Sequence, residues 1–305
     1  MVVPLVVQDL PPPADVSAFE TSACAEKMIL YTPTRFPEQS VFFDLGIVGT
    51  VKVHHLNCGT MVMGMVDHCL LIETADCLVL VDTGFGLNCV RDPARVLGWS
   101  RHVTRPRLAE RDTAIRQVAA LGYDPADVRH ILLTHLDYDH AGGLADFPWA
   151  TVHVREPEFH AASNPTLAER PRYRPQQWAH GPKWAMSSAT GGENWFGFQA
   201  VRELPGLPAE FLVVPLVGHT RGHAGVAVDT GAGWLLHAGD AFLSDVEIRR
   251  NTMAVGVIGR VRGAMGSLPK TYVENVARLA ELHRAHGAEM TIFASHDAAA
   301  FERLR

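Results

Sequence analysis

Short apolar runs separated by polar turns dominate the chain from residue 51 onward. A half-buried strand alternates apolar and polar residues, whereas a continuously apolar run indicates a strand that is covered on both faces. The run at residues 77–81 is of the second kind, and a turn that begins at Asp82 follows it directly. The strands predicted in this part of the chain are residues 51–56, 61–63, 69–72 and 77–81.

Helical periodicity alternates with further strands in the rest of the chain. Residues 109–121 predict a helix, and the Leu-Gly pair at its end is a stop signal. Asp124 followed by Pro125 is typical of an N-cap and a first helical position, so a short helix is expected there. The remaining predicted elements are strands at 131–133, 211–217, 225–228, 234–236 and 290–294, and an amphipathic helix at 271–287.

Two segments lack this periodicity. Residues 1–45 mix prolines with short apolar pieces, and we expect them to form an N-terminal arm on the main body. Residues 155–200 combine prolines with aromatic side chains, as an insert near the site or a packed strap does. We expect substrate selection in this insert and in the loop that contains Arg250 and Met253. No repeat or low-complexity linker divides the chain, so residues 1–305 are predicted to form a single domain.

Composition adds limits on compartment and partners. The 305 residues are 47% hydrophobic and 20% charged with a net charge of −6, which permits a sizeable core and disfavours nucleic acid as a partner. The five cysteines contain no Cys-x-x-Cys pair, which favours a reducing compartment over a disulfide framework. Neither a basic signal-peptide start nor a bilayer-length apolar run is present. We therefore expect a cytoplasmic protein whose partner is a small-molecule substrate, with no nucleic acid and no membrane; a homodimer stays open.

Residues 134–143 are the most informative segment of the chain. They place two histidines and two carboxylates within six positions, directly after the apolar strand at 131–133. Extended backbone directs His135, Asp137 and Asp139 to one face. His140 follows directly, and the glycines after it permit a turn. Because a solvated charged loop fits this density of ligand-type side chains poorly, we predict that the loop supplies ligands to two metal ions.

Three further ligand-type residues follow predicted strands. They are His219, Asp240 and His296. Each alone has an ordinary structural explanation, since a histidine after a strand is often only hydrogen-bonded and Gly-Asp is a common turn. Together with the 134–143 loop, they are expected to converge on one edge of a sheet.

The order of these motifs resembles the metallo-β-lactamase-fold superfamily. The matching motifs are Asp82-Thr83-Gly84, His-x-x-x-Asp-His, Gly-His-Thr-x-Gly-His, Gly-Asp and a terminal Ser-His-Asp, over roughly residues 51–300. The resemblance implies an α/β (α+β) fold, an αββα sandwich of two mixed β-sheets flanked by helices, with metal ions at one edge. In layout the chain is most similar to the acyl-homoserine-lactone hydrolases of that superfamily.

The resemblance also implies a role for each matched position. The implied ligands are His135 and His219 for the first metal ion, Asp139, His140 and His296 for the second, and Asp240 as the bridge. The implied supporting residues are Asp82, which orients ligands, and Thr220 and His223, which hold the His219 loop.

Asp137 departs from the family's usual His-x-His-x-Asp-His motif. Two divalent ions and two aspartates leave a formal charge of +2, whereas Asp137 as a third aspartate ligand leaves +1. A less positive centre acidifies its water less, and an oxygen ligand shifts preference toward iron or manganese. We expect two divalent metal ions, zinc before iron or manganese, because geometry and availability usually outweigh such preferences.

The expected reaction follows from what two metal ions do well. With a bridging hydroxide they supply a nucleophile and stabilise an oxyanion, which favours cleavage of an ester, lactone or thioester, with Asp139 or Asp240 exchanging the proton. The aromatic insert favours an acyl or ring-bearing substrate. The related lactone hydrolases carry a tyrosine three residues after the bridging aspartate, where this chain has Leu243. The candidate substrate contacts are Tyr138, Tyr173, Trp178 and Arg221, and either tyrosine would have to replace the missing one.

Two other functions stay open. The first is an iron-dependent oxidoreductase that uses the carboxylate-rich first site, since flavodiiron oxidoreductases also place a carboxylate there; this chain has no room for their flavodoxin domain. The second is a small-molecule-binding protein in which Asp137 marks decay of the catalytic site. Oxygen consumption with a reductant identifies the first, and a tight ligand without turnover identifies the second.

Overall fold

The computed structural model describes residues 51–188, 192–202, 204–250 and 266–305. The predicted arm at residues 1–45 and Met253 lie outside the described residues, so the predictions made for them stay predictions.

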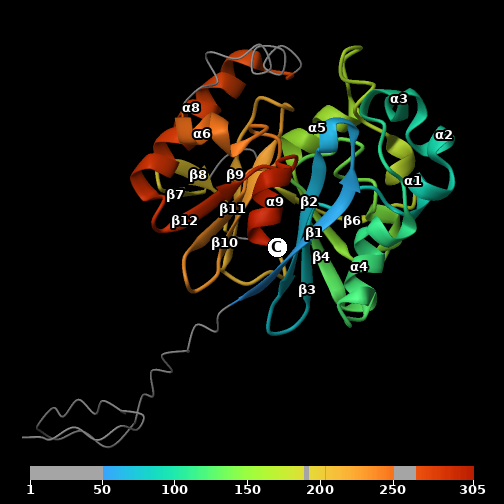
Figure 1. The fold of residues 1–305 in the computed structure, drawn as a ribbon, viewed down its shortest axis with the longest axis horizontal. Coiled ribbons are helices and arrows are strands. Elements are labelled where there is room, and N and C mark those ends of the chain that lie inside the picture. The colour runs from blue at the N-terminus through green and yellow to red at the C-terminus, as the bar shows by residue number, and fades with distance from the viewer. Residues whose placement is uncertain (1–50, 189–191, 203, 251–265) are drawn as a thin grey trace, which may run out of the picture. The chain divides into compact units, whose positions relative to one another are not determined.

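Two mixed sheets form the centre of the described part, as predicted (Figure 1). The first sheet has the order β1-β2-β3-β4-β5-β6, antiparallel from β1 to β3 and parallel from β3 to β6. In the second sheet, of order β12-β11-β10-β9, only the β11–β12 pair is parallel. The strands of the first sheet are β1 Lys52–Thr60, β2 Val66–Glu73, β3 Leu78–Val81, β4 Val128–Leu132, β5 Thr151–Arg155 and β6 Lys183–Ser187. Those of the second are β9 Phe211–Pro215, β10 Ala224–Asp229, β11 Trp234–His237 and β12 Met290–Phe293, and a separate hairpin pairs β7 Glu193–Trp195 with β8 Phe198–Ala200.

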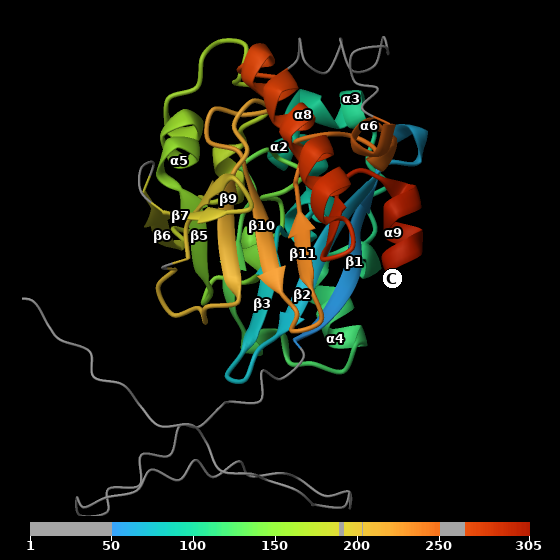
Figure 2. The same ribbon diagram turned by 90° about the vertical axis from the view of Figure 1, so that its left-hand side faces the viewer.

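Helices cover the outer faces of both sheets (Figures 1 and 2). Val118 of α4 and Ala161 of α5 pack in the cluster under the first sheet, and Val276 and Leu279 of α8 pack under the second. The α-helices are α1 Leu87–Arg91, α2 Pro93–Val96, α3 Arg101–Thr104, α4 Ala114–Ala120, α5 Glu156–Ser163, α6 Asp245–Arg250, α8 Pro269–His286 and α9 Ala298–Leu304. The 3-10 helices are η1 Val62–Gly64, η2 Gly98–Ser100, η3 Glu110–Asp112, η4 Pro125–Asp127, η5 Leu144–Asp146 and η6 Pro175–Gln177. Within the described ranges, none of the helices has the length and apolar character needed to cross a membrane.

The layers arise because side chains alternate between the two faces of each strand. In β2, Leu70 and Ile72 join the cluster between the two sheets, whereas Leu71 joins the cluster beneath α4. All three side chains are fully buried, and burial of one such side chain contributes roughly 1.5–3 kcal/mol. Because a strand places successive side chains on opposite faces, one apolar run supplies both the inner and the outer layer.

Several parts of the chain differ from the sequence prediction, among them β5, α6 and α9, which were not predicted. Residues 61–63, predicted as a strand, lie at the turn between β1 and β2, where η1 forms and Met63 has a left-handed φ of 62°. The insert at 155–200, predicted to lack periodic structure, contains α5 and β6–β8. The helices α1–α3 were not predicted, because each spans only four or five residues and a run that short shows little periodicity.

A pair of histidines, one half-buried and one buried, joins neighbouring strands of the first sheet. His130 of β4 and His153 of β5 approach with Nδ1 and Nε2 3.0 Å apart. His153 is only 3% exposed, and burial, together with His130, lowers its pKa to about 4. The folded protein therefore holds this imidazole neutral below the ordinary histidine range.

We expect His153→Gln to reduce the loss of stability that acid causes. A depressed folded pKa means that stability is fully present above the unfolded pKa near 6.5 and is lost as pH falls toward 4. Between pH 7 and pH 5 the variant should lose about 2 kcal/mol less unfolding free energy than wild type. Denaturant unfolding at both pH values measures this, with the exposed His160→Gln as the control. Equal losses in wild type and His153→Gln would contradict it.

Candidate metal centre

The predicted ligands lie in four turns that follow four strands. The 134–143 loop follows β4, His219 follows β9, Asp240 follows β11 and His296 follows β12. Two backbone hydrogen bonds, Ala238 N to Phe293 O and Ser295 N to Gly239 O, join the last two turns. Gly239 has a φ of 56°, a left-handed conformation that glycine adopts without steric cost. The fold therefore brings together residues more than 150 positions apart in sequence.

The first ligand group consists of His135, Asp137 and His219. All three are buried, and their ligating atoms lie within 4.8 Å of one another. Asp137 Oδ2 is 3.0 Å from His219 Nε2 and 3.5 Å from His135 Nε2. The structure thus places Asp137 in the same group as the two histidines. Asp137 is the residue at which the sequence departs from the usual motif.

The second ligand group consists of Asp139, His140 and His296, also buried and within 4.8 Å. Asp240 lies between the two groups. Its Oδ1 is 3.1 Å from His296 Nε2 and 3.5 Å from His140 Nε2, and its Oδ2 is 3.4 Å from His219 Nε2. One carboxylate therefore presents one oxygen to each group, as a bridging ligand does.

Charges within the cluster determine which groups are ionised. Burial acts to raise the pKa of Asp240, but His296 and His219 overcome it and hold that pKa well below its usual value. Burial likewise opposes the lowered pKa of Asp137, which Arg172 and His135 produce. Burial, reinforced by Arg172, lowers the pKa of His219 to about 3. Burial acts to lower the pKa of His296, but Asp240 overcomes it and raises that pKa to about 10, so this imidazole has to lose a proton before it can bind a metal ion.

Buried polar atoms in the cluster fit a metal ion. His135 Nε2, His140 Nε2 and Asp137 Oδ1 are buried and have no hydrogen-bond partner in the part of the chain that the structure describes. An unsatisfied buried polar atom costs about 1–3 kcal/mol, so several in one place need an explanation. Metal coordination would explain these unsatisfied atoms, because they belong to imidazole and carboxylate side chains that lie in groups able to hold a metal ion.

Asp82 and Thr134 orient two of the ligating histidines. Asp82 accepts hydrogen bonds from Thr134 N (2.8 Å), Thr134 Oγ1 (2.7 Å) and His140 Nδ1 (2.9 Å). Because the Thr134 hydroxyl donates to Asp82, it accepts from His135 Nδ1 at 2.8 Å. Both imidazoles are thereby held with Nε2 toward the cluster. The orienting role of Asp82 stays a prediction from the resemblance, and Thr134 was not singled out from the sequence.

His223 holds the bridge residue in place. Its Nδ1 donates to Leu216 O at 2.9 Å, and its Nε2 accepts from the backbone N of Asp240 at 2.9 Å. Burial lowers the pKa of His223 well below the usual value, which keeps the accepting nitrogen unprotonated. His223 therefore supports Asp240 as well as its own loop.

Glu158 joins the two main ligand loops, and sequence reasoning missed it. It is fully buried in α5 and accepts hydrogen bonds from Leu136 N (3.0 Å), Thr220 Oγ1 (2.6 Å) and Gly222 N (3.1 Å). Thr220 thus supports its loop through Glu158. A side chain at Gly222 would meet Glu158 backbone at 2.0 Å, so this contact requires glycine.

Two further charged residues were also missed. Arg172 lies beside the first group, with Nη2 3.4 Å from Asp137 Oδ2. Asp67 is 2% exposed, with Oδ1 3.4 Å from His296 Nδ1, and burial raises its pKa to about 7. No local motif marks either residue, because both reach the cluster only through tertiary contacts.

The four candidate substrate contacts make other contacts in the structure. The Tyr138 hydroxyl donates to Thr104 Oγ1 at 3.3 Å, and the Tyr173 hydroxyl donates to Glu158 Oε1 at 3.3 Å. Trp178 packs against the cluster under the first sheet, and Arg221 forms an ion pair with Glu169 at 2.9 Å. All four candidate side chains therefore already have a partner within the protein. A substrate that contacts one of them would have to share or displace that partner.

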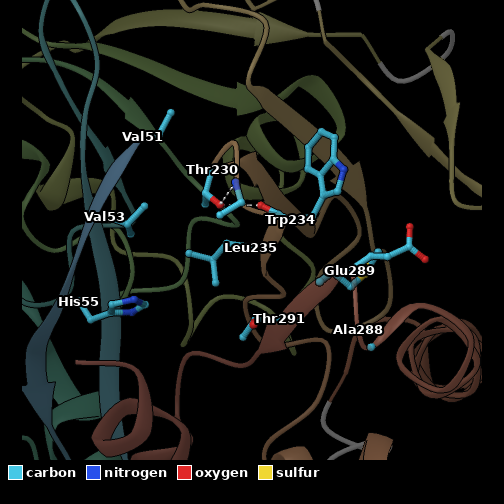
Figure 3. Close-up of a pocket in the computed structure, with 13 residues that line it drawn as sticks. Val51, Val53, His55, Thr230, Trp234, Leu235, Ala288, Glu289 and Thr291 are labelled. Atoms are coloured by element: carbon cyan, nitrogen blue, oxygen red, sulfur yellow. Dashed lines mark hydrogen bonds between the residues drawn. The ribbon is translucent and has the colours of Figure 1, made fainter. Parts of the chain in front are cut away.

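A separate pocket lies at the opposite ends of β11 and β12 (Figure 3). It has a volume of about 310 Å³, and its lining includes Val53 and His55 of β1, Trp234 at the start of β11 and Met290 at the start of β12. The ligand turns follow the other ends of these two strands. This pocket is therefore distinct from the candidate metal centre.

The structure thus combines two mixed sheets with buried histidine and aspartate groups at one edge that could hold metal ions. The chain belongs to the metallo-beta-lactamase superfamily, whose family model matches residues 64–293. A probable metallo-hydrolase of Mycobacterium tuberculosis is 47% identical over 264 residues, which cover 84% of this chain and 83% of that protein.

Two further comparisons concern lactone hydrolases. The N-acyl homoserine lactonase AttM of Rhizobium johnstonii is 36% identical over 95 residues, 31% of this chain and 36% of that protein. A solved N-acyl homoserine lactone hydrolase, with the product N-hexanoyl-L-homoserine bound at its catalytic metal center, matches with a TM-score of 0.64 and 21% identity, covering 84% and 97% of the two chains. At that identity the structural match supports the fold. The family and the buried ligand groups together support a metallo-hydrolase.

Proposed function

We propose that this chain is a dinuclear metal-dependent hydrolase that cleaves an ester, lactone or thioester bond of a small-molecule substrate. The position of Asp240 carries the proposal, because its two oxygens face separate ligand groups. The ligating atoms of Asp240, His135 and His140 also lie within 4.8 Å of one another, so Asp240 reaches a histidine of each group. The proposal includes a cytoplasmic location and neither nucleic acid nor a membrane as partner, with a homodimer still open.

Each ligand group has its own task in this proposal. His135, Asp137 and His219 would hold one divalent ion, and Asp139, His140 and His296 the other. When bound, the ions supply a hydroxide near neutral pH and stabilise negative charge on a carbonyl oxygen. Asp139 is 8% exposed and Asp240 is 3% exposed, so Asp139 is better placed to exchange a proton with solvent. Zinc is the proposed metal, since imidazole and carboxylate ligands suit it.

The substrate class has narrower support. The local match to AttM favours a lactone. Leu243 stands where the related lactone hydrolases have tyrosine, and the hydroxyls of Tyr138 and Tyr173 already bond Thr104 and Glu158. Trp178, a candidate substrate contact, packs against the cluster under the first sheet, as Trp184 does, and Trp195 packs in the cluster under the second. We therefore keep esters and thioesters beside lactones.

A substrate panel tests the proposal. It comprises acyl-homoserine lactones of several chain lengths, aryl esters and acyl thioesters. We expect hydrolysis of at least one class, loss of that activity after chelator treatment, and recovery with zinc. Buffer with the same free zinc is the control. Failure with all three classes, or activity that survives metal removal, contradicts the proposal. Oxygen consumption by iron-loaded protein with a thiol would favour the oxidoreductase instead.

A further inference from the structure

Asp137 brings a third aspartate into the ligand groups, and the structure places a cation directly beside it. Arg172 Nη2 is 3.4 Å from Asp137 Oδ2 and also 3.4 Å from His219 Nε2. Arg172 Nη1 donates to the carbonyl oxygen of His219. The guanidinium therefore contacts two of the three residues in the first ligand group.

The position of Arg172 is fixed from several directions. Its carbonyl accepts from Tyr138 N at 3.0 Å, and the next residue, Tyr173, forms a backbone bridge with Asp137. The Arg172 side chain is 16% exposed. A largely enclosed arginine favours a counter-charge, since removing an unpaired charge from water is costly. Among the described residues, Asp137 is the carboxylate that lies within ion-pair distance of Arg172.

We propose that Arg172 is the charge partner of Asp137, so that the two together replace, as one neutral unit, the histidine that the usual motif has at this position. Two divalent ions with three aspartates leave a formal charge of +1, and the guanidinium restores +2. The centre would thus keep the net charge of the ordinary ligand set. Arg172 is a positioning and charge-compensating residue in this account, and the inference rests on the proposed metal centre.

The proposal predicts opposite effects for the two members of the pair. Arg172→Met makes the centre one charge more negative, so zinc should bind more tightly. Asp137→His leaves the guanidinium without its counter-charge beside the ion, so zinc should bind more weakly. A unit charge at this range changes divalent-ion affinity by about tenfold or more, even in a partly screened site.

A zinc competition titration of apoprotein against a chromophoric chelator tests this. We expect about tenfold tighter binding for Arg172→Met, about tenfold weaker binding for Asp137→His, and wild-type affinity for the double variant. Arg172→Lys keeps the charge and should bind zinc as wild type does. Arg174→Met is the matched control, because this arginine of the same segment bonds Val96 O and contacts no predicted ligand in the described residues. Its zinc affinity should not change.

The outcomes separate this inference from the proposed function. Wild-type protein that takes up no zinc contradicts the metal centre itself. Zinc uptake by wild type, with weaker or unchanged binding in Arg172→Met, contradicts only the role of Arg172. If Arg172→Met does not fold, the double variant that combines Arg172→Met with Asp137→His is the test. The inference is wrong if this double variant binds zinc no more tightly than Asp137→His does.

Discussion

Asp240→Asn is expected to lower the rate of hydrolysis about a hundred- to a thousand-fold, the usual cost of removing one preorganised electrostatic group. The amide has nearly the shape of the carboxylate but only one oxygen. Asp240 Oδ1 faces His296 and His140, and Oδ2 faces His219, so the amide must turn an NH₂ toward one ligand group. Steady-state rates on any substrate that the panel identifies measure the effect.

Asp245→Asn is the matched control for that change. Asp245 is also a buried aspartate, but its Oδ2 pairs with Arg249 and Arg303 at 2.9 and 3.0 Å, and it belongs to none of the ligand groups found among the described residues. We expect this variant to keep the wild-type rate. If Asp240→Asn hydrolyses substrate within twofold of wild type, Asp240 has no part in the reaction and the proposed mechanism is wrong.

Glu158→Leu is expected to destabilise the protein by about 3–5 kcal/mol, the cost of removing one partner from a buried charged network. The change leaves Leu136 N, Thr220 Oγ1 and Gly222 N without their acceptor. It also removes the carboxylate whose charge stabilises the buried Arg155 guanidinium. Denaturant unfolding measures the loss.

Glu156→Leu, on the same helix, is the control for Glu158→Leu. Glu156 is exposed in the first turn of α5, where loss of a carboxylate costs about 0.3–1 kcal/mol. The zinc content of Glu158→Leu should also fall, because the His135 and His219 loops lose their shared anchor. Similar stabilities for the two variants would show that Glu158 does not join the loops.

The ligand turns could be predicted because their signals are local. A continuous apolar run predicts β3, and the dense ligand-type residues of the 134–143 loop follow a strand directly. The two-sheet sandwich came from the resemblance, and the structure confirms it. Local signals fail where a turn replaces a strand: at residues 61–63, three apolar residues in a row look the same in η1 as in a strand.

The supporting charges could not be predicted, since their roles depend on distant partners. Glu158 meets Thr220 across 62 positions, and Arg172 meets His219 across 47. In the sequence each is one charged residue among many, and a surface position is the ordinary expectation for Glu or Arg. Asp67 is a similar case, because it is one of three polar residues in β2, together with His68 and Glu73, and its position in the strand does not set it apart from them.

The central claim is that the two ligand groups hold two divalent ions. Elemental analysis of protein purified without added metal, expressed as metal atoms per chain, tests it most directly. The account predicts about two atoms per chain, with zinc dominant. Protein that holds no divalent metal, even after exposure to zinc, iron and manganese, would contradict it.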